Sequence, residues 1–177
     1  TVVGGASHHP VARNLIDQLS GEKVIVVPDE AWRRAVLHAR GDSIKPEGRL
    51  SFASRSLNTE HLRTLRSQIP EGFRVERIDT TLAERIRREV SADLILPEVF
   101  PSPSDFVERG VGFCAIAEDG VIVSGATSAL VCDDAIEIQI NTNEPFRRKG
   151  LATAVGAALI VDCLERGIDP RWDTGNP

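Results

Sequence analysis

Tyrosine and methionine are absent from this chain of 177 residues, and cysteine occurs only three times. Cys114, Cys132 and Cys163 show neither a Cys-x-x-Cys pair nor a Cys/His ligand spacing, which predicts reduced thiols, a cytoplasmic protein and no metal site. No apolar run reaches the roughly 18 residues of a membrane span, and no basic-then-apolar signal pattern opens the sequence, so we expect no membrane partner. The missing methionine and the loop-like residues 172–177 indicate a fragment of a longer protein.

Positive charge is also missing from one long stretch. Between Val111 and Phe146 there is no lysine or arginine, whereas the acids there are Glu118, Asp119, Asp133, Asp134, Glu137 and Glu144. A field of one sign favours a cationic amine as substrate, although four of these acids lie in turns, where acids are common for other reasons. The net charge of −5 argues against a nucleic-acid partner.

The first part of the chain alternates helical and strand patterns without recognisable chemistry. Hydrophobic residues make up 41% of the whole sequence and charged residues 27%, which is ordinary for a folded globular protein. We interpret residues 1–72 as an N-terminal α/β segment of unassigned role. Its expected elements are a helix over 11–19, a strand over 23–27, a helix over 30–40 capped by Asp29, a strand over 49–55 and a helix over 59–68.

The second part, residues 73–177, is more regular. Two hairpin-like turns, 118–120 and 132–134, join three strands that should therefore be antiparallel neighbours. The helix that follows them is apolar nearly all round and must be buried against the sheet. The expected elements are a strand over 73–78, a helix over 80–90, a short helix over 104–109, strands over 111–117, 121–131 and 135–142, a helix over 151–166 and a strand beginning at 170–172.

A basic turn, Arg147-Arg148-Lys149-Gly150-Leu151-Ala152, joins the last of the three strands to this helix. The unpaired N–H groups of a helix N-terminus, together with the helix dipole, favour an anion. Gly150 lets the backbone approach that anion because it has no Cβ. An alternative is that the cations only complement an exposed turn, but cations are locally unfavourable at a helix N-terminus unless an anion binds there. The turn therefore predicts a pyrophosphate site.

This order of elements, with the basic turn, resembles the GNAT superfamily of acyl-CoA-dependent N-acetyltransferases, whose turn follows the pattern Gln/Arg-x-x-Gly-x-Gly/Ala. Residues 109–114, 123–126, 137–140 and 163–173 look like the GNAT subfamily that includes zwittermicin A resistance acetyltransferases. The resemblance covers residues 73–177 well and the first seventy only loosely. It implies a mixed α/β sheet of the GNAT type over 73–177, incomplete at its C-terminal end, with residues 1–72 as an additional segment.

The resemblance also implies acetyl-CoA as co-substrate. In these enzymes the strand before the turn diverges from its neighbour and pairs through its backbone with the pantetheine arm, while the turn and the helix N-terminus hold the pyrophosphate. In this chain, that assigns the pantetheine arm to Ile140, Asn141 and Thr142. The resemblance assigns the pyrophosphate to Arg147, Arg148, Lys149, Gly150, Leu151, Ala152 and Thr153. Asn176 matches an asparagine that contacts the coenzyme in these enzymes.

Glu137 is the best candidate for a general base. Alternation along the strand places Ile136, Ile138 and Ile140 on one face and Glu137 on the other, where a carboxylate in an apolar sheet is costly unless it lines a wet cleft. Desolvation there would raise its pKa towards that of a useful base. The alternative is a solvated position on a half-buried strand.

A tyrosine usually protonates the departing thiolate in this superfamily, from a helix that would start near Pro177. Because the chain has no tyrosine, the general acid lies outside the sequence, is replaced by water, or is absent. Ser124 and Ser128, on the middle strand, either bind substrate or permit close packing.

Three functions are compatible with these residues. The first is acetyl-CoA-dependent N-acetylation of a small-molecule amine, an antibiotic or metabolite, by direct attack in a ternary complex. The second is a non-catalytic acyl-CoA-binding or regulatory module, which the missing tyrosine favours and Glu137 opposes. The third is a peptide or protein N-acetyltransferase. A homodimer is among the options for assembly.

Overall fold

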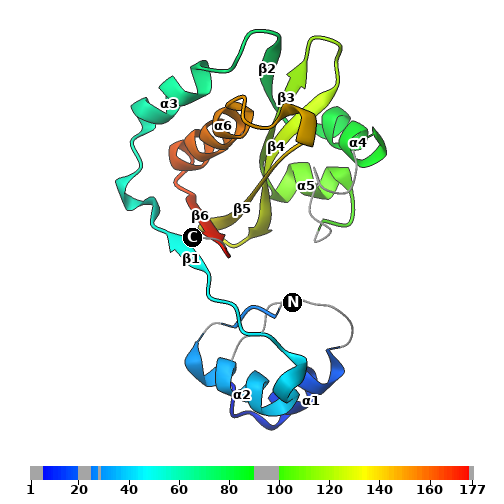
Figure 1. Ribbon diagram of the computed structural model, residues 1–177, viewed down its shortest axis with the longest axis vertical. Helices are drawn as coiled ribbons and strands as arrows, with labels where there is room; N and C mark the ends of the chain where they lie inside the picture. The colour runs from blue at the N-terminus through cyan, green and yellow to red at the C-terminus, as the bar shows by residue number, and fades with distance from the viewer. Residues whose placement is uncertain (1–5, 20–24, 28, 90–99, 176–177) are drawn as a thin grey trace. The chain divides into compact units, whose positions relative to one another are not determined.

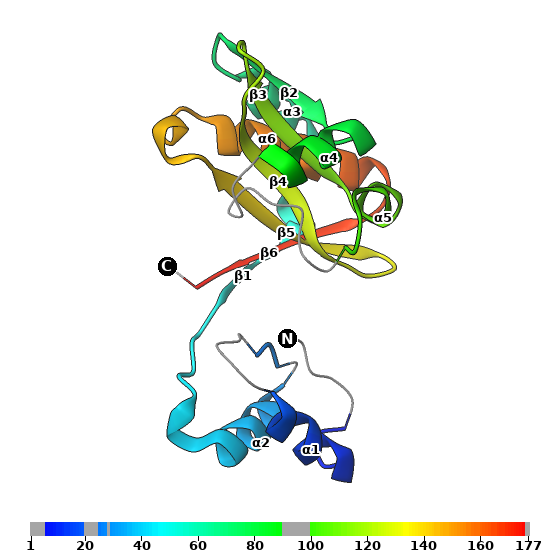
Figure 2. The same ribbon diagram turned by 90° about the vertical axis from the view of Figure 1, so that its right-hand side faces the viewer.

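The computed structural model describes residues 6–19, 25–27, 29–89 and 100–175 (Figures 1 and 2). The chain divides into two compact units, Thr1–Gly48 and Arg49–Pro177. The predicted boundary at 72/73 lies later in the sequence than this division. Residues 49–72 join the second unit because they contribute a strand that pairs with the last strand of the sheet and a helix that packs on the longest helix.

The first unit is a small helical cluster. Its helices are α1 (Pro10–Gln18) and α2 (Glu30–Arg40), and a 3-10 turn (Gly41–Ser43) follows. As predicted, Asp29 caps α2 by accepting a hydrogen bond from the Trp32 N–H at 2.8 Å. Ala12, Ile16, Trp32 and Val36 form the buried core of the unit. Part of the strand predicted over 23–27 lies outside the described residues, and in the rest only Val26 forms an isolated β-bridge.

The second unit contains the regular elements expected from the sequence, with shifts of a residue or two at their ends. The strand predicted over 49–55 is shorter, because a 3-10 turn (Ser54–Ser56) replaces its second half. The elements are β1 (Leu50–Phe52), α3 (Thr59–Ser67), β2 (Phe73–Arg77), α4 (Thr80–Glu89), α5 (Pro103–Arg109), β3 (Gly112–Ala117), β4 (Ile122–Val131), β5 (Ala135–Thr142), a 3-10 turn (Glu144–Phe146), α6 (Leu151–Glu165) and β6 (Asp169–Thr174).

The strands form one mixed sheet in the order β1-β6-β5-β4-β3-β2. Strands β2 to β5 are antiparallel neighbours, which confirms the predicted arrangement of the three hairpin-connected strands. Helix α6 then carries the chain across the sheet so that β6 pairs parallel with β5. Strand β1 comes from much earlier in the sequence and pairs antiparallel with β6. The predicted mixed α/β fold class is confirmed.

Helices cover both faces of the sheet, with α6 and α3 on one face and α4 and α5 on the other (Figure 1). Successive side chains of β3 point to opposite faces of the sheet. Phe113 and Ala115 therefore pack against α6, while Cys114 and Ile116 pack against α4 and α5. Helix α6 is buried along most of its length, as its apolar sequence predicts. No helix among the described residues is long and apolar enough to cross a membrane.

Candidate functional site

Strands β5 and β6 are paired along only part of the length of β5. The two strands pair over Ala135↔Asp169, Ile136↔Pro170 and Glu137↔Arg171, whereas β5 itself continues to Thr142. Figure 2 shows the two strands diverging beyond their paired ends. Among the described residues, the edge of residues 138–142 of β5 that faces away from β4 therefore has no paired strand, and we call this unpaired stretch the opening.

The backbone groups that face this opening can be identified from the hydrogen bonds of β5. The Asn143 N–H donates to the Val123 carbonyl at 2.9 Å, and the Asn141 carbonyl accepts from the Ser124 hydroxyl at 2.9 Å, so these odd-numbered residues point towards β4. Backbone polar groups alternate in direction along a strand. The N–H and carbonyl groups of Ile140 and Thr142 therefore point into the opening, where the resemblance assigns the pantetheine arm.

Two side chains contact the backbone of Thr142 at the end of β5. Its N–H donates to Asn141 Oδ1 at 3.1 Å, and its carbonyl accepts from Arg147 Nε at 3.1 Å. The structure thus brings Asn141, Thr142 and Arg147 together at the point where β5 leads into the basic turn.

Ser124 and Ser128 serve the packing of the sheet. Both side chains are fully buried. Ser124 Oγ lies 2.8 Å from Thr142 Oγ1, and Ser128 Oγ accepts the Val111 N–H at 3.0 Å. Because both hydroxyls bond within the protein, the structure supports close packing, rather than substrate binding, as their role.

The basic turn has two residues in the left-handed region of the backbone, Arg148 with φ +64° and Gly150 with φ +82°. Gly150 is the N-cap of α6 and supplies no capping side chain to the first-turn N–H groups. A Cβ built at Gly150 meets no atom of the described residues within 4 Å, so that part of the chain leaves the space beside the turn open. Lys149 lies with its Nζ 5.3 Å from the centre of the Phe146 ring. The turn therefore combines open space, uncapped helix N–H groups and exposed cations.

The remaining predicted cofactor residues divide between backbone and side-chain roles. The side chain of Leu151 is buried in the core and leaves only its backbone N–H for an anion. Ala152 and Thr153 are exposed in the first turn of α6, and Ile140 is half-buried against the α6 core. Asn176 lies outside the described residues.

Glu137 sits at the base of the opening, at the last paired position between β5 and β6. It is half-buried, and its Oε1 accepts a hydrogen bond from the Asp173 N–H at 3.1 Å. Burial raises the pKa of the Glu137 carboxyl above its ordinary value, and the charge of Asp173 raises this pKa further. The N–H bond and the guanidinium groups of Arg49 and Arg171 oppose this rise in pKa.

Asp173 and Arg49 are neighbours of Glu137 that the sequence interpretation missed. Arg49 donates to both carboxylate oxygens of Asp173, although the two residues are 124 positions apart. No local spacing pattern connects them, because β1 meets β6 only through the tertiary fold.

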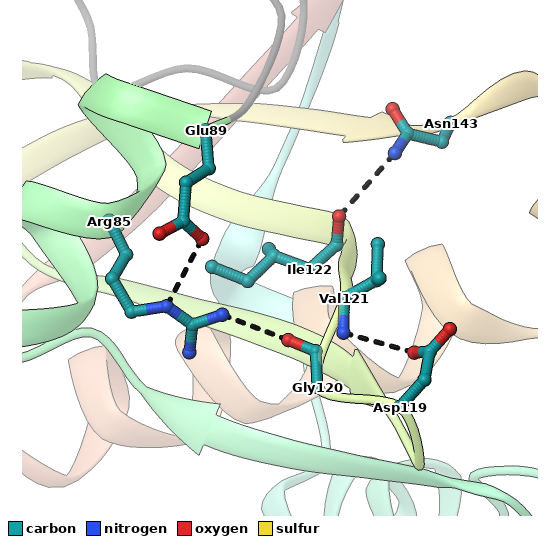
Figure 3. A pocket seen from close by; sticks show the side chains of 7 residues that line it. All are labelled: Arg85, Glu89, Asp119, Gly120, Val121, Ile122 and Asn143. Carbon is teal, nitrogen blue, oxygen red and sulfur yellow. Dashed lines mark hydrogen bonds and ion pairs between the residues drawn. The ribbon is translucent and has the colours of Figure 1, made fainter.

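A separate hollow of about 360 Å³ lies between α4 and the β3–β4 turn, beside Asn143 (Figure 3). Arg85 crosses it to bond the Gly120 carbonyl at 2.9 Å and Glu89 at 3.3 Å. The Asp119 carboxylate accepts the Val121 N–H at 3.0 Å. Glu89 and Asp119, the two acids that line this hollow, are thus both bonded within the protein. We therefore assign the hollow no role in substrate binding.

Comparison with known proteins agrees with this arrangement. The model of the GNAT acetyltransferase family matches residues 1–177, so the chain belongs to the GNAT acetyltransferase family. Among individual proteins, it is similar to an uncharacterized N-acetyltransferase, YdfB, from Bacillus subtilis (strain 168), with 35% identity over 106 residues that make up 60% of this chain and 40% of that protein.

Two solved structures have a similar fold. A GCN5-related N-acetyltransferase-like protein from Streptococcus suis superimposes with a TM-score of 0.66 and 32% identity, over 85% of this chain and 60% of that one. A GCN5-related N-acetyltransferase from Kribbella flavida gives a TM-score of 0.58 and 15% identity, over 85% and 55%. The chain thus spans between 40% and 60% of the length of these relatives.

Proposed function

We propose that the protein transfers an acetyl group from acetyl-CoA to the amine of a small molecule, by direct attack within a ternary complex. The observation that carries this proposal is the opening between β5 and β6. Along it the backbone N–H and carbonyl groups of Ile140 face away from β4, and Thr142, whose backbone groups bond Asn141 Oδ1 and Arg147 Nε, precedes the turn that leads to the uncapped N-terminus of α6. An extended chain with amide groups fits such an edge, since it can add to it as a strand does.

The basic turn suits the pyrophosphate of this co-substrate. The N–H groups of residues 151–153 supply donors, and the open space beside Gly150 allows close approach. The exposed side chains of Arg148 and Lys149 add positive charge that an anion neutralises, and Arg147 contributes from its position beside Thr142.

Glu137 suits the role of general base. An amine substrate is an ammonium ion at neutral pH and cannot attack until it loses a proton, which the Glu137 carboxylate accepts. The neutral nitrogen then attacks the thioester carbonyl carbon, and the carbon–sulfur bond breaks with its electron pair going to sulfur. The attacking nitrogen loses a second proton to become an amide, and the thiolate takes up one proton. The products are the acetylated amine, the free thiol of coenzyme A and one proton.

The acidic stretch between Val111 and Phe146 supports a cationic acceptor. It contains six acids and no lysine or arginine, and Glu137 is the member of this set that lies at the opening. Such a field attracts a cation and raises its local concentration.

The proposal is tested by calorimetry with acetyl-CoA, followed by a thiol-release assay with a panel of polyamine-like and aminoglycoside-like amines. We expect saturable binding, and turnover with at least one cationic amine. Binding of acetyl-CoA without acetylation of any amine would contradict the proposed enzyme and favour an acyl-CoA-binding module.

A further inference from the structure

Arg49 and Asp173 form a bidentate ion pair beside the opening. Arg49 immediately precedes β1, and its Nε and Nη2 donate to the two carboxylate oxygens of Asp173 at 2.8 and 2.6 Å. The strands that carry the two residues are paired, since Ser51 of β1 lies opposite Asp173 of β6. The backbone therefore holds both side chains, and a bidentate guanidinium–carboxylate pair has a defined geometry.

Asp173 connects this ion pair to Glu137. The β5–β6 ladder ends at Glu137↔Arg171, and beyond it the Asp173 N–H donates to Glu137 Oε1 at 3.1 Å. The Glu137 side chain thus accepts the Asp173 N–H where, in a continuing ladder, a backbone carbonyl of β5 would accept it. This bond restricts the position of the Glu137 carboxylate, and the side chain of Asp173 remains engaged with Arg49.

We infer that Arg49 and Asp173 are positioning residues for Glu137, which hold its carboxylate at the opening. The inference rests on the proposed function, because it assigns a role to residues around the same site. Neither residue needs to contact substrate. Residues 49–72, which precede the strand–helix pattern of the superfamily, therefore contribute a charge to the reaction centre.

The two charges act on Glu137 in opposite directions. The negative charge of Asp173 raises the pKa of the Glu137 carboxyl, and the positive charge of Arg49 lowers it. Arg171 of β6 also lowers this pKa. On the other side, β4 places the apolar Leu130 opposite Glu137, and α6 packs on the face of β5 that carries Ile136 and Ile138. Among the described residues, the charged groups that act on the pKa of Glu137 are Asp173 and Arg171 of β6 and Arg49, which precedes β1.

A structural ion pair alone predicts a different outcome. The side chains of Arg49 and Asp173 are 45% and 33% exposed, and exposed pairs of this kind contribute little to folding. If the pair only joined β1 to β6, removing either partner would loosen the same contact. The two substitutions would then have similar effects on the protein, without opposite effects on Glu137.

The test uses Arg49→Gln and Asp173→Asn, with Arg63→Gln as the matched control. Asparagine keeps the backbone N–H that bonds Glu137, removes the negative charge and replaces one of the two oxygens that accept from Arg49 with an NH2 group. Arg63 forms a comparable exposed ion pair with Glu165 on α6, at 2.6 Å. For each variant, the pKa of the Glu137 carboxyl is measured by NMR titration of its side-chain carbon, and kcat is measured across pH at saturating amine.

We expect Arg49→Gln to raise the pKa of the Glu137 carboxyl by about one unit at low salt. The midpoint of the acid side of the pH profile of kcat should rise by about the same amount. Asp173→Asn should move both down by about the same amount, the double variant should return near the wild type, and Arg63→Gln should leave both unchanged. Both shifts should shrink at high ionic strength, because these charges are partly exposed.

Shifts of the same sign in the two variants, or no shift in either, would overturn the positioning role. The NMR titration reads Glu137 directly, so it decides this inference even where turnover is absent. A pH profile of kcat that is the same in wild type and Glu137→Gln would instead refute the assignment of Glu137 as base, while the titration still reports on the two neighbours.

Discussion

Replacing Gly150 by alanine separates the anion site from the stability of the helix that carries it. Gly150 has φ +82°, and within the described part of the chain no atom lies within 4 Å of a Cβ built on it. Gly167, just beyond the other end of α6, has φ +71° and is equally open. The two glycines therefore impose the same kind of backbone penalty on an added Cβ, but only one of them lies at the helix N-terminus.

The expected magnitudes follow from this geometry. An alanine in the left-handed region costs about 1 kcal/mol relative to glycine, so each variant should lose about 2–4 °C in Tm for a chain of this size. At Gly150, the added methyl group also occupies the space through which an anion reaches the N–H groups of α6. Loss of one charge-assisted hydrogen bond, about 1.5–3 kcal/mol, weakens binding by about tenfold or more.

Calorimetry with acetyl-CoA and thermal unfolding, performed on both variants, measure the two effects separately. We expect similar losses of Tm, a rise of about tenfold or more in the Kd of Gly150→Ala, and an unchanged Kd for Gly167→Ala. Equal affinities for acetyl-CoA in the two folded variants would refute the pyrophosphate site at this turn.

Two further predictions concern the core. Burial raises the pKa of the Cys114 thiol to about 12 and that of the Cys163 thiol to about 11, whereas Cys132 is exposed. A thiol reagent at pH 8 should therefore label Cys132 alone in the folded protein and all three cysteines in denaturant. Ser128→Ala removes the acceptor of the buried Val111 N–H and should cost about 1–3 kcal/mol in the free energy of unfolding, measured by urea titration, whereas an unchanged midpoint would contradict the packing role.

The sequence predicted the second unit well because its signals are local. Hairpin turns joined β3, β4 and β5, and the nearly uniform apolarity of α6 required burial on a sheet. The basic turn was recognisable for the same reason, since its glycine, its cations and the helix start lie within six residues.

Interactions between distant parts of the chain escaped prediction. The strand over 49–55 was expected, but not its pairing with β6, and neither composition nor spacing joined Arg49 to Asp173 across 124 positions. Alternation placed Glu137 on the correct face of β5, but could not show that the ladder ends there. The boundary predicted at 72/73 reflects the same limit, because α3 joins the second unit through its packing of Leu62 on α6.

The most direct test of the account is the turnover of Glu137→Gln, compared with wild type across pH at saturating acetyl-CoA and amine. Glutamine keeps the shape of the side chain and its ability to accept the Asp173 N–H, but it cannot take a proton from the substrate. Affinity for acetyl-CoA should survive, while kcat at neutral pH falls by about 10²–10⁴-fold. The difference in kcat between Glu137→Gln and wild type should become smaller as pH rises, because more of the amine is then already deprotonated in solution. A variant that is as fast as wild type at neutral pH would contradict the account.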